Sequence, residues 1–175
     1  MARSTDILVD AFSRIGDEVE AVVRGLAPHD LEFRPSGEGN SIAWLIWHLT
    51  RIQDDHVADA AGIPQVWVSG GWHERLGLPF ALQATGYGHG PDEVAAVRVD
   101  SGEPLVGYHD AVRAQTIGYL GTLTDEALDR VVDGAWDPPV LLGVRLVSVI
   151  GDDLQHVGQA AYVRGLLPPA AEREA

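Results

Sequence analysis

The stretch VRLVSVIGDDLQHVGQAAYVRG, residues 144–165, decides how this chain folds and which chemistry it can carry. Apolar residues recur through it at helical spacing, and the pattern ends at Gly165 ahead of Pro168, so it predicts a long helix. Asp152 and His156 are four residues apart, which places their side chains on one helix face, about 6 Å apart at Cβ. The pair is therefore spaced to hold one divalent metal ion.

A second helical stretch, SIAWLIWHLTRIQDDHVADA at residues 41–60, contains the third candidate ligand, His48. We expect this helix to begin at a cap on Asn40 or Ser41 and to run to about Ala61. At about 100° per residue, His48 falls at the edge of an apolar stripe and faces inward; the stripe consists of Ile42, Leu45, Leu49 and Ile52. Three protein ligands leave a coordination position for water or substrate, as catalytic metal sites do.

Each candidate ligand also has a simpler interpretation. In the simpler interpretation of α-helical spacing, Asp152 and His156 are only a hydrogen-bonded pair on a solvated helix face. In the simpler interpretation of His48, it is a core histidine bonded to a backbone carbonyl or to Asp55. Asp153 competes with Asp152, although the spacing of four residues favours Asp152. A buried imidazole without a partner costs about 1–3 kcal/mol, and a metal ion would remove that cost. The metal hypothesis and the simpler alternatives both stay open at this point.

The other histidines have weaker signals. His56 points about 80° away from His48 and is expected beside the site or at the surface. The remaining four have no helical ligand partner and are expected in loops or on helix surfaces: His29, His73, His89 and His109. Among them, His73 follows Trp72 and is a candidate to line a substrate pocket.

Composition excludes several classes of function. The chain has 12 basic and 26 acidic residues and a net charge of −14, the wrong sign for binding nucleic acid or an anionic membrane surface. It shows no secretory leader and no apolar run of about 18 residues, so a cytoplasmic location is expected. The chain has no cysteine, which excludes disulfides, a thiolate zinc site and a catalytic cysteine. Any thiol chemistry therefore needs a thiol from another molecule.

The remaining sequence predicts one domain over residues 1–175. An amphipathic helix extends from Leu8 and stops near Gly25, and helical periodicity returns between Tyr108 and Leu123. Residues 62–104 form a long glycine- and proline-rich connection with short helical turns at 72–76 and 91–97, and no convincing strand appears. We therefore predict an all-α four-helix bundle with a long loop insertion between its second and third helices.

The final helix has two distinct sides. Arg145 and Gln159 share a line with Asp152 and His156, and the opposite side is apolar, with Val147, Ile150, Leu154, Val157 and Ala161. Apolar faces left over from a four-helix bundle often pair between copies, so a homodimer is expected.

Three motifs resemble the DinB-like superfamily of metal-binding four-helix bundles over nearly the whole chain. They are HLTRxxDDH from His48, GYHDAV at 107–112 and DDLQHxGQAAYxRG from Asp152. The resemblance implies an up-down-down-up bundle and a divalent metal, zinc or nickel, held by His48, Asp152 and His156. Many relatives have histidine where this chain has Asp152, whereas the mycothiol-dependent maleylpyruvate isomerases have a carboxylate there.

The resemblance further implies a mycothiol-dependent S-transferase or isomerase that acts on small electrophiles. Arg145 and Arg51 are then candidates to bind a carboxylate of the thiol or substrate, and Gln159 is a candidate to orient a ligand. Trp72 and His73 complete the candidate substrate-binding set.

Three alternatives use the same residues. The first is a metal-dependent hydrolase of a small amide or thiol conjugate, with Asp55 as general base. The second is a ferrous-iron oxygenase with two histidines and one carboxylate as ligands. The third is a non-catalytic, stress-related metal-binding module.

Overall fold

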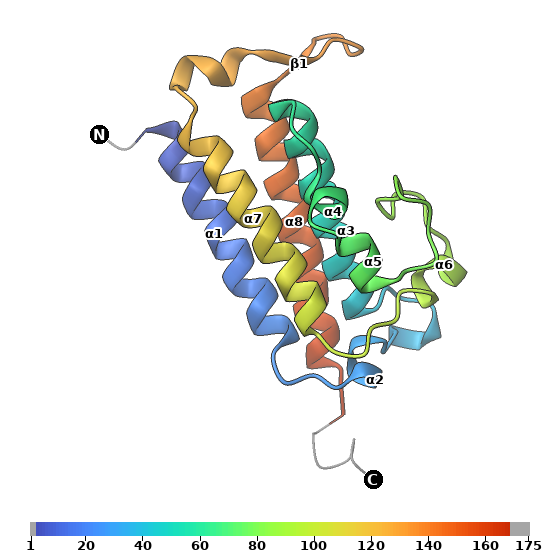
Figure 1. The fold of residues 1–175 in the computed structure, drawn as a ribbon. Coiled ribbons are helices and arrows are strands. Elements are labelled where there is room, and N and C mark those ends of the chain that lie inside the picture. Colours follow the sequence, from blue (N-terminus) through green and yellow to red (C-terminus); the bar gives the residue numbers. More distant parts are fainter. Residues whose placement is uncertain (1–2, 169–175) are drawn as a thin grey trace.

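The structure is a computed structural model that describes residues 3–168. Four long helices make up most of the fold. They are α1 (Ser4–Val23), α3 (Ile42–Ala61), α7 (Glu103–Gly121) and α8 (Leu142–Gly165). Figure 1 shows that α3 and α7 run opposite to α1 and α8, which is the up-down-down-up arrangement. Each of α7 and α8 packs against both α1 and α3. The prediction of an all-α four-helix bundle is confirmed.

Local capping explains where α3 begins and ends and where α1 begins. The hydroxyl of Ser41 accepts the backbone N–H of Trp44 at 3.2 Å, and Gly62 ends α3 in the left-handed conformation with φ of 67°. At the start of α1, the carboxylate of Asp6 accepts the backbone N–H of Arg3 at 2.9 Å. The predicted boundaries of α3 are thereby confirmed.

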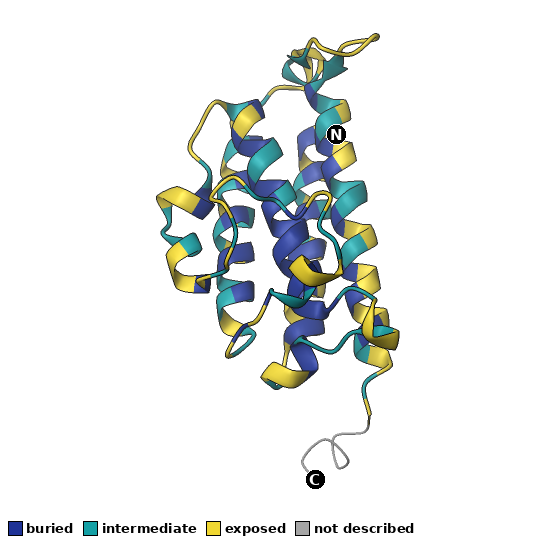
Figure 2. Ribbon diagram, turned by 90° about the vertical axis from the view of Figure 1, so that its right-hand side faces the viewer, coloured by how far each residue is buried: buried dark blue, intermediate teal, exposed yellow. Residues whose placement is uncertain are grey.

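The core lies where the long helices face one another, and the outer sides of α1 and α8 are exposed (Figure 2). It is made of apolar residues from all four helices, including Phe12, Ile15, Leu45, Leu49, Val112, Leu120, Leu146 and Val149. Each fully buried side chain of this size contributes about 1.5–3 kcal/mol through the hydrophobic effect. Of the 20 residues of α3, 15 are buried, because this helix is also covered on its outer side.

The connections on either side of α3 contain short helices. Before α3 come α2 (Pro28–Leu31) and the 3-10 turn η1 (Pro35–Gly37). After α3, the long insertion contains α4 (Val66–Ser69), α5 (Trp72–Leu76) and α6 (Pro91–Ala95). The two helical turns predicted within the insertion are confirmed.

A buried ion pair fastens the insertion to the bundle. Arg51 and Asp54 of α3 are both fully buried, with Arg51 Nη1 3.5 Å from Asp54 Oδ2. Asp54 accepts the first two backbone N–H groups of α4 at 2.8 and 2.7 Å and the hydroxyl of Tyr108 at 2.8 Å. Arg51 donates to the side chain of Gln65 and to the carbonyl oxygen of Ala84, both at 3.0 Å. Because removal of one partner from a buried pair costs about 3–5 kcal/mol, this contact holds the insertion in place.

A small hairpin connects α7 to α8. It follows the 3-10 turn η2 (Asp125–Asp129) and pairs β1 (Val131–Asp133) antiparallel with β2 (Val140–Leu141). The prediction that no strand is present was wrong here, because such short strands carry no readable alternation of apolar and polar residues. Among residues 3–168, no helix is both long and apolar enough to cross a membrane.

His109 of α7 was predicted at the surface and is instead buried, with 1% of its surface exposed. Neither ring nitrogen has a hydrogen-bond partner within residues 3–168. Burial, aided by the positive charge of Arg113, lowers the pKa of His109 from 6.5 to about 3. The folded protein therefore holds this imidazole in its neutral form.

We predict that His109→Leu makes the protein less sensitive to acid. The folded state resists protonation of His109 down to pH about 3, whereas the unfolded chain binds that proton near pH 6.5. The contribution of His109 to the free energy of unfolding is therefore fully present above pH 6.5. It falls as the pH drops, by about 2 kcal/mol between pH 6.5 and 5. Urea unfolding at both pH values should show that the variant loses about 2 kcal/mol less than the wild type.

The exposed His29 provides the control for this experiment. His29→Leu should keep the acid sensitivity of the wild type. An unchanged pH dependence in His109→Leu would contradict the prediction.

Candidate metal centre

The contact between α3 and α8 brings together three side chains that are remote in sequence. His48 comes from α3, and Asp152 and His156 come from α8. One potential ligand atom from each lies within 4.8 Å of the other two. His48 is buried, whereas Asp152 and His156 are half-buried, so the cluster lies at the edge of the core.

Both imidazoles have one nitrogen occupied by a hydrogen bond. His48 Nδ1 lies 2.6 Å from the carbonyl oxygen of Thr85, which can only accept, so this nitrogen carries the proton. His156 Nδ1 lies 3.0 Å from Oε1 of Gln159 in the same arrangement. In each neutral ring the lone pair is then on Nε2, the atom that binds a metal when Nδ1–H is bonded to an oxygen.

Electrostatics keeps His48 in the form that a metal requires. Burial lowers the pKa of His48, and this effect is opposed by the hydrogen bond to Thr85 and reinforced by the neighbouring His156. At neutral pH the ring is therefore uncharged and retains a free lone pair. A metal ion does not have to displace a proton from it.

The donor set fits a divalent cation. His156 Nε2 and Asp152 Oδ1 are 3.7 Å apart, too far for a hydrogen bond. Ligand atoms about 2.1 Å from one ion in tetrahedral geometry lie about 3.4 Å apart, so the observed spacing is close to that of two ligands sharing an ion. Asp152 Oδ2 is buried and has no hydrogen-bond partner within residues 3–168. A cation would satisfy this atom.

The sequence profile of the DinB superfamily matches residues 11–160, which include all three residues of the cluster. The chain belongs to the DinB superfamily. Its fold is similar to that of a conserved protein from Enterococcus faecalis, known from a crystal structure, with a TM-score of 0.87 and 30% sequence identity. The match covers 94% of this chain and 96% of the other. No protein with a curated description matches the chain.

In this DinB protein an aromatic layer surrounds the imidazoles. The indole of Trp44 stacks on His48 with ring centres 4.6 Å apart and meets the ring of His156 at 6.2 Å. Trp44 Nε1 donates to His89 Nδ1 at 3.3 Å, and His89 stacks on Trp47. Sequence reasoning missed His89, which has no signal beyond its glycine-rich surroundings, because the path of a loop determines what it contacts.

The position of His48 also depends on a second loop contact, which the sequence did not indicate. Gly86 has a φ of 93°, and a Cβ at this residue would lie 2.7 Å from His48 Nδ1 and 3.0 Å from the ring of Trp47. Only glycine combines this backbone conformation with so close an approach. The neighbouring carbonyl of Thr85 can therefore reach the imidazole.

Two other predicted residues of α8 have clear positions. Gln159 Oε1 lies 3.0 Å from His156 Nδ1, and its role in orienting a ligand stays a prediction. Arg145 instead donates to Asp133 of the hairpin at 3.1 Å and lies 3.2 Å from His56 Nδ1. Burial and Arg145 lower the pKa of His56, which is half-buried beside the cluster. Arg145 thus links α8 to α3 and the hairpin.

Apart from His48, the predicted site residues outside α8 do not join the cluster. Asp55 accepts a hydrogen bond from Gln65 at 2.7 Å, and the guanidinium of Arg51 is used in the buried ion pair. Trp72 packs on Tyr108 of α7, and Nδ1 of His73 lies 3.3 Å from the carbonyl oxygen of residue 67. Within residues 3–168, no hydrogen bond, ion pair or ring contact joins Trp72 or His73 to the triad. Asp153 is fully buried, and the carboxylate in the cluster is that of Asp152.

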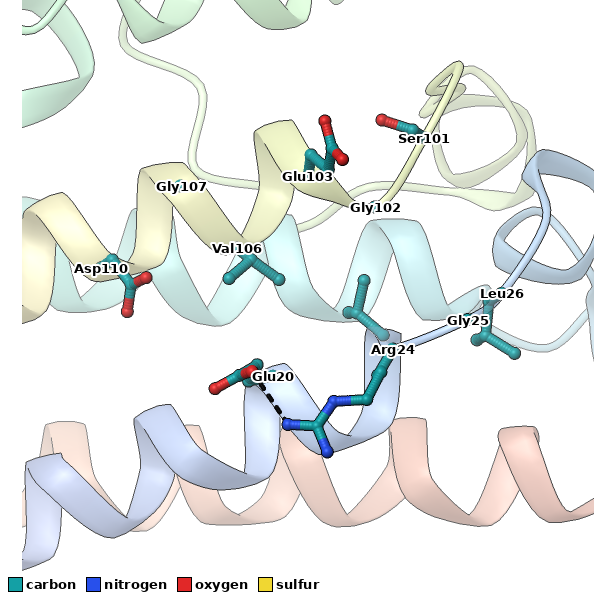
Figure 3. A pocket seen from close by; sticks show the side chains of 11 residues that line it. Glu20, Arg24, Gly25, Leu26, Ser101, Gly102, Glu103, Val106, Gly107 and Asp110 are labelled. Carbon is teal, nitrogen blue, oxygen red and sulfur yellow. Dashed lines mark hydrogen bonds and ion pairs between the residues drawn. The ribbon is translucent and has the colours of Figure 1, made fainter.

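Two grooves differ in their relation to the cluster. One, of about 430 Å³, is lined by Gln159 and Tyr162 of α8 together with Leu45 and Asn40, and Gln159 connects it to His156. The other, of about 470 Å³, lies between the end of α1 and the start of α7 (Figure 3). None of the triad residues lines either groove. The first groove is next to the candidate metal centre through the contact of Gln159 with His156.

We predict that Gly86→Ala weakens metal binding at least ten-fold. The added methyl group would push against His48 Nδ1 and displace the loop whose carbonyl fixes that ring. Competition titration of zinc or cobalt against a chelator measures the effect.

Gly88→Ala is the matched control for this loop. Gly88 also has a positive φ, 78°, but apart from its chain neighbours no atom of the described residues lies within 4 Å of the point that a Cβ would occupy there. Both substitutions therefore strain the backbone in a similar way, and only Gly86→Ala presses on the ligand. Equal metal affinities in the two variants would contradict the positioning role of Gly86.

Proposed function

We propose that this DinB protein is a divalent-metal-binding enzyme, a thiol-dependent S-transferase or isomerase that acts on small electrophiles with mycothiol as co-substrate. The observation that carries the proposal is the convergence of His48, Asp152 and His156 within 4.8 Å. Two imidazoles and one carboxylate suit zinc or nickel. Three protein ligands leave room for a fourth from solvent or substrate.

The missing cysteine supports a thiol supplied from outside. The chain has no sulfur nucleophile of its own, since its 175 residues include no cysteine. A divalent ion at this centre supplies a Lewis-acid position that brings the pKa of a thiol or water toward neutrality. His48 and His156 would hold the ion through Nε2, while Thr85 and Gln159 keep their Nδ1 protons in place.

The adjacent groove supports a small and mainly uncharged substrate. Its lining combines apolar surface from Leu45 and Tyr162 with the side-chain amides of Asn40 and Gln159. Trp44 covers one face of His48 and limits access of water from that side. Arg145 and Arg51 are engaged elsewhere, so we do not assign them to substrate binding.

A hydrolase that uses water as nucleophile is less well supported. It requires a general base within reach of the bound water. The candidate base, Asp55, is bonded to Gln65 and does not belong to the cluster. The proposed thiol-dependent reaction does not require this carboxylate.

We predict that the purified protein binds close to one equivalent of zinc or nickel, and that His48→Ala or His156→Ala lowers this below a tenth of an equivalent. Elemental analysis of protein prepared without chelators measures the content. His29→Ala is the control, because His29 is exposed and remote in sequence from the ligands. Less than a tenth of an equivalent in the wild type, even after incubation with each metal, would remove the metal hypothesis.

We further predict that the metal-loaded protein consumes a small electrophile only when mycothiol is added. Asp152→Ala should abolish this turnover together with metal binding. Turnover without thiol would favour the hydrolase, and dependence on ferrous iron and oxygen would favour an oxygenase. A metal-loaded protein inactive under all three conditions would instead indicate a non-catalytic module.

A further inference from the structure

The solvent side of α8 carries a regular apolar stripe. It alternates steps of three and four residues, and its members are Val144, Val147, Gly151, Leu154, Gly158 and Ala161. Val144, Val147 and Leu154 are 58%, 61% and 52% exposed. The core contacts of the helix are made instead by residues such as Leu146, Val149 and Val157. The stripe therefore has no partner within residues 3–168.

The exposed side of α8 also lacks charge. Its exposed residues, from Val144 to Gly165, include no Asp, Glu, Lys or Arg. By contrast, the exposed side of α1 carries six charged residues: Asp6, Asp10, Arg14, Asp17, Glu18 and Glu20. In a chain with a net charge of −14, an uncharged helix face of this length is where two copies can approach without like charges meeting.

When two copies are placed antiparallel about a two-fold axis, the larger side chains of one stripe lie opposite the smaller side chains of the other. Such an arrangement sets Val144 opposite Ala161 and Val147 opposite Gly158 of the second copy. It also sets Leu154 opposite Gly151. Every layer then pairs a larger side chain with a smaller one. Apart from the local backbone of α8, no atom of residues 3–168 lies within 4 Å of a Cβ placed at Gly151 or Gly158, so each glycine leaves space for the opposing side chain.

We propose that the protein forms a homodimer through the antiparallel packing of two α8 helices along this stripe. The proposal does not depend on the metal chemistry, because its residues point away from the triad. It does place the second copy beside the groove of the metal centre, since Gly158 and Tyr162 line that groove. An anionic membrane is a poor occupant of the stripe because the chain is strongly acidic.

We predict a mass near twice 18.8 kDa for the wild type at tens of micromolar, measured by light scattering or sedimentation. Leu154→Lys should return the mass to that of one chain without loss of folding, because Leu154 is 52% exposed. Ile7→Lys on α1 is the matched control, since Ile7 is 66% exposed and lies outside the stripe; it should leave the dimer intact. A monomeric wild type, or a dimer that survives Leu154→Lys, would overturn the proposal.

The absence of cysteine allows a direct test of the antiparallel arrangement. Val147→Cys and Gly158→Cys chains should each remain unlinked alone and should form a disulfide-linked pair when mixed under mild oxidation. Cross-linking of either variant with itself, or none in the mixture, would contradict the antiparallel packing. A size swap adds a second check: Gly151→Leu should weaken the dimer at least ten-fold, and Gly151→Leu with Leu154→Ala should restore it.

Discussion

The packing of α3 against α8 is the contact on which the rest of the structure depends. It joins the helix that carries His48 to the helix that carries Asp152 and His156. Ligand candidates about a hundred residues apart in the sequence therefore lie together in space. The other elements hold α3 in position for this contact. α7 packs on it from a second side, and the insertion covers its outer side through the buried pair of Arg51 and Asp54. A residue far from the cluster can therefore affect its geometry.

The sequence predicted the bundle, and it identified His48, Asp152 and His156 as candidate ligands while simpler interpretations of them stayed open. Helical periodicity identified the long helices, and Ser41 and Gly62 mark the ends of α3 through ordinary capping. The spacing of Asp152 and His156 is a local property of a helix, so their shared face could be predicted before any tertiary contact was known. His48 required one further argument, that its position on α3 pointed inward.

The remaining features could not be predicted because they depend on the path of irregular backbone or on small rotations of a helix. Thr85, Gly86 and His89 lie in a segment without periodicity, and their contacts with α3 follow only from how the insertion folds back. On α8, the apolar side predicted opposite the ligands proved partly exposed. The buried side of α8 includes Asp153, and it leaves out Val147 and Leu154, which are exposed. A pattern based on hydrophobicity places Asp153 at the surface, so it could not predict which side of α8 faces the core.

The close approach of Gly86 to His48 makes the insertion and the metal centre thermodynamically linked. The carbonyl of Thr85 fixes the imidazole only while the segment around it is closed over α3. If an ion binds more tightly to that closed state, occupancy must stabilise the closed segment by the same factor. Slower amide hydrogen exchange in the backbone around Gly86 would then report on an ion to which that backbone is not itself a ligand.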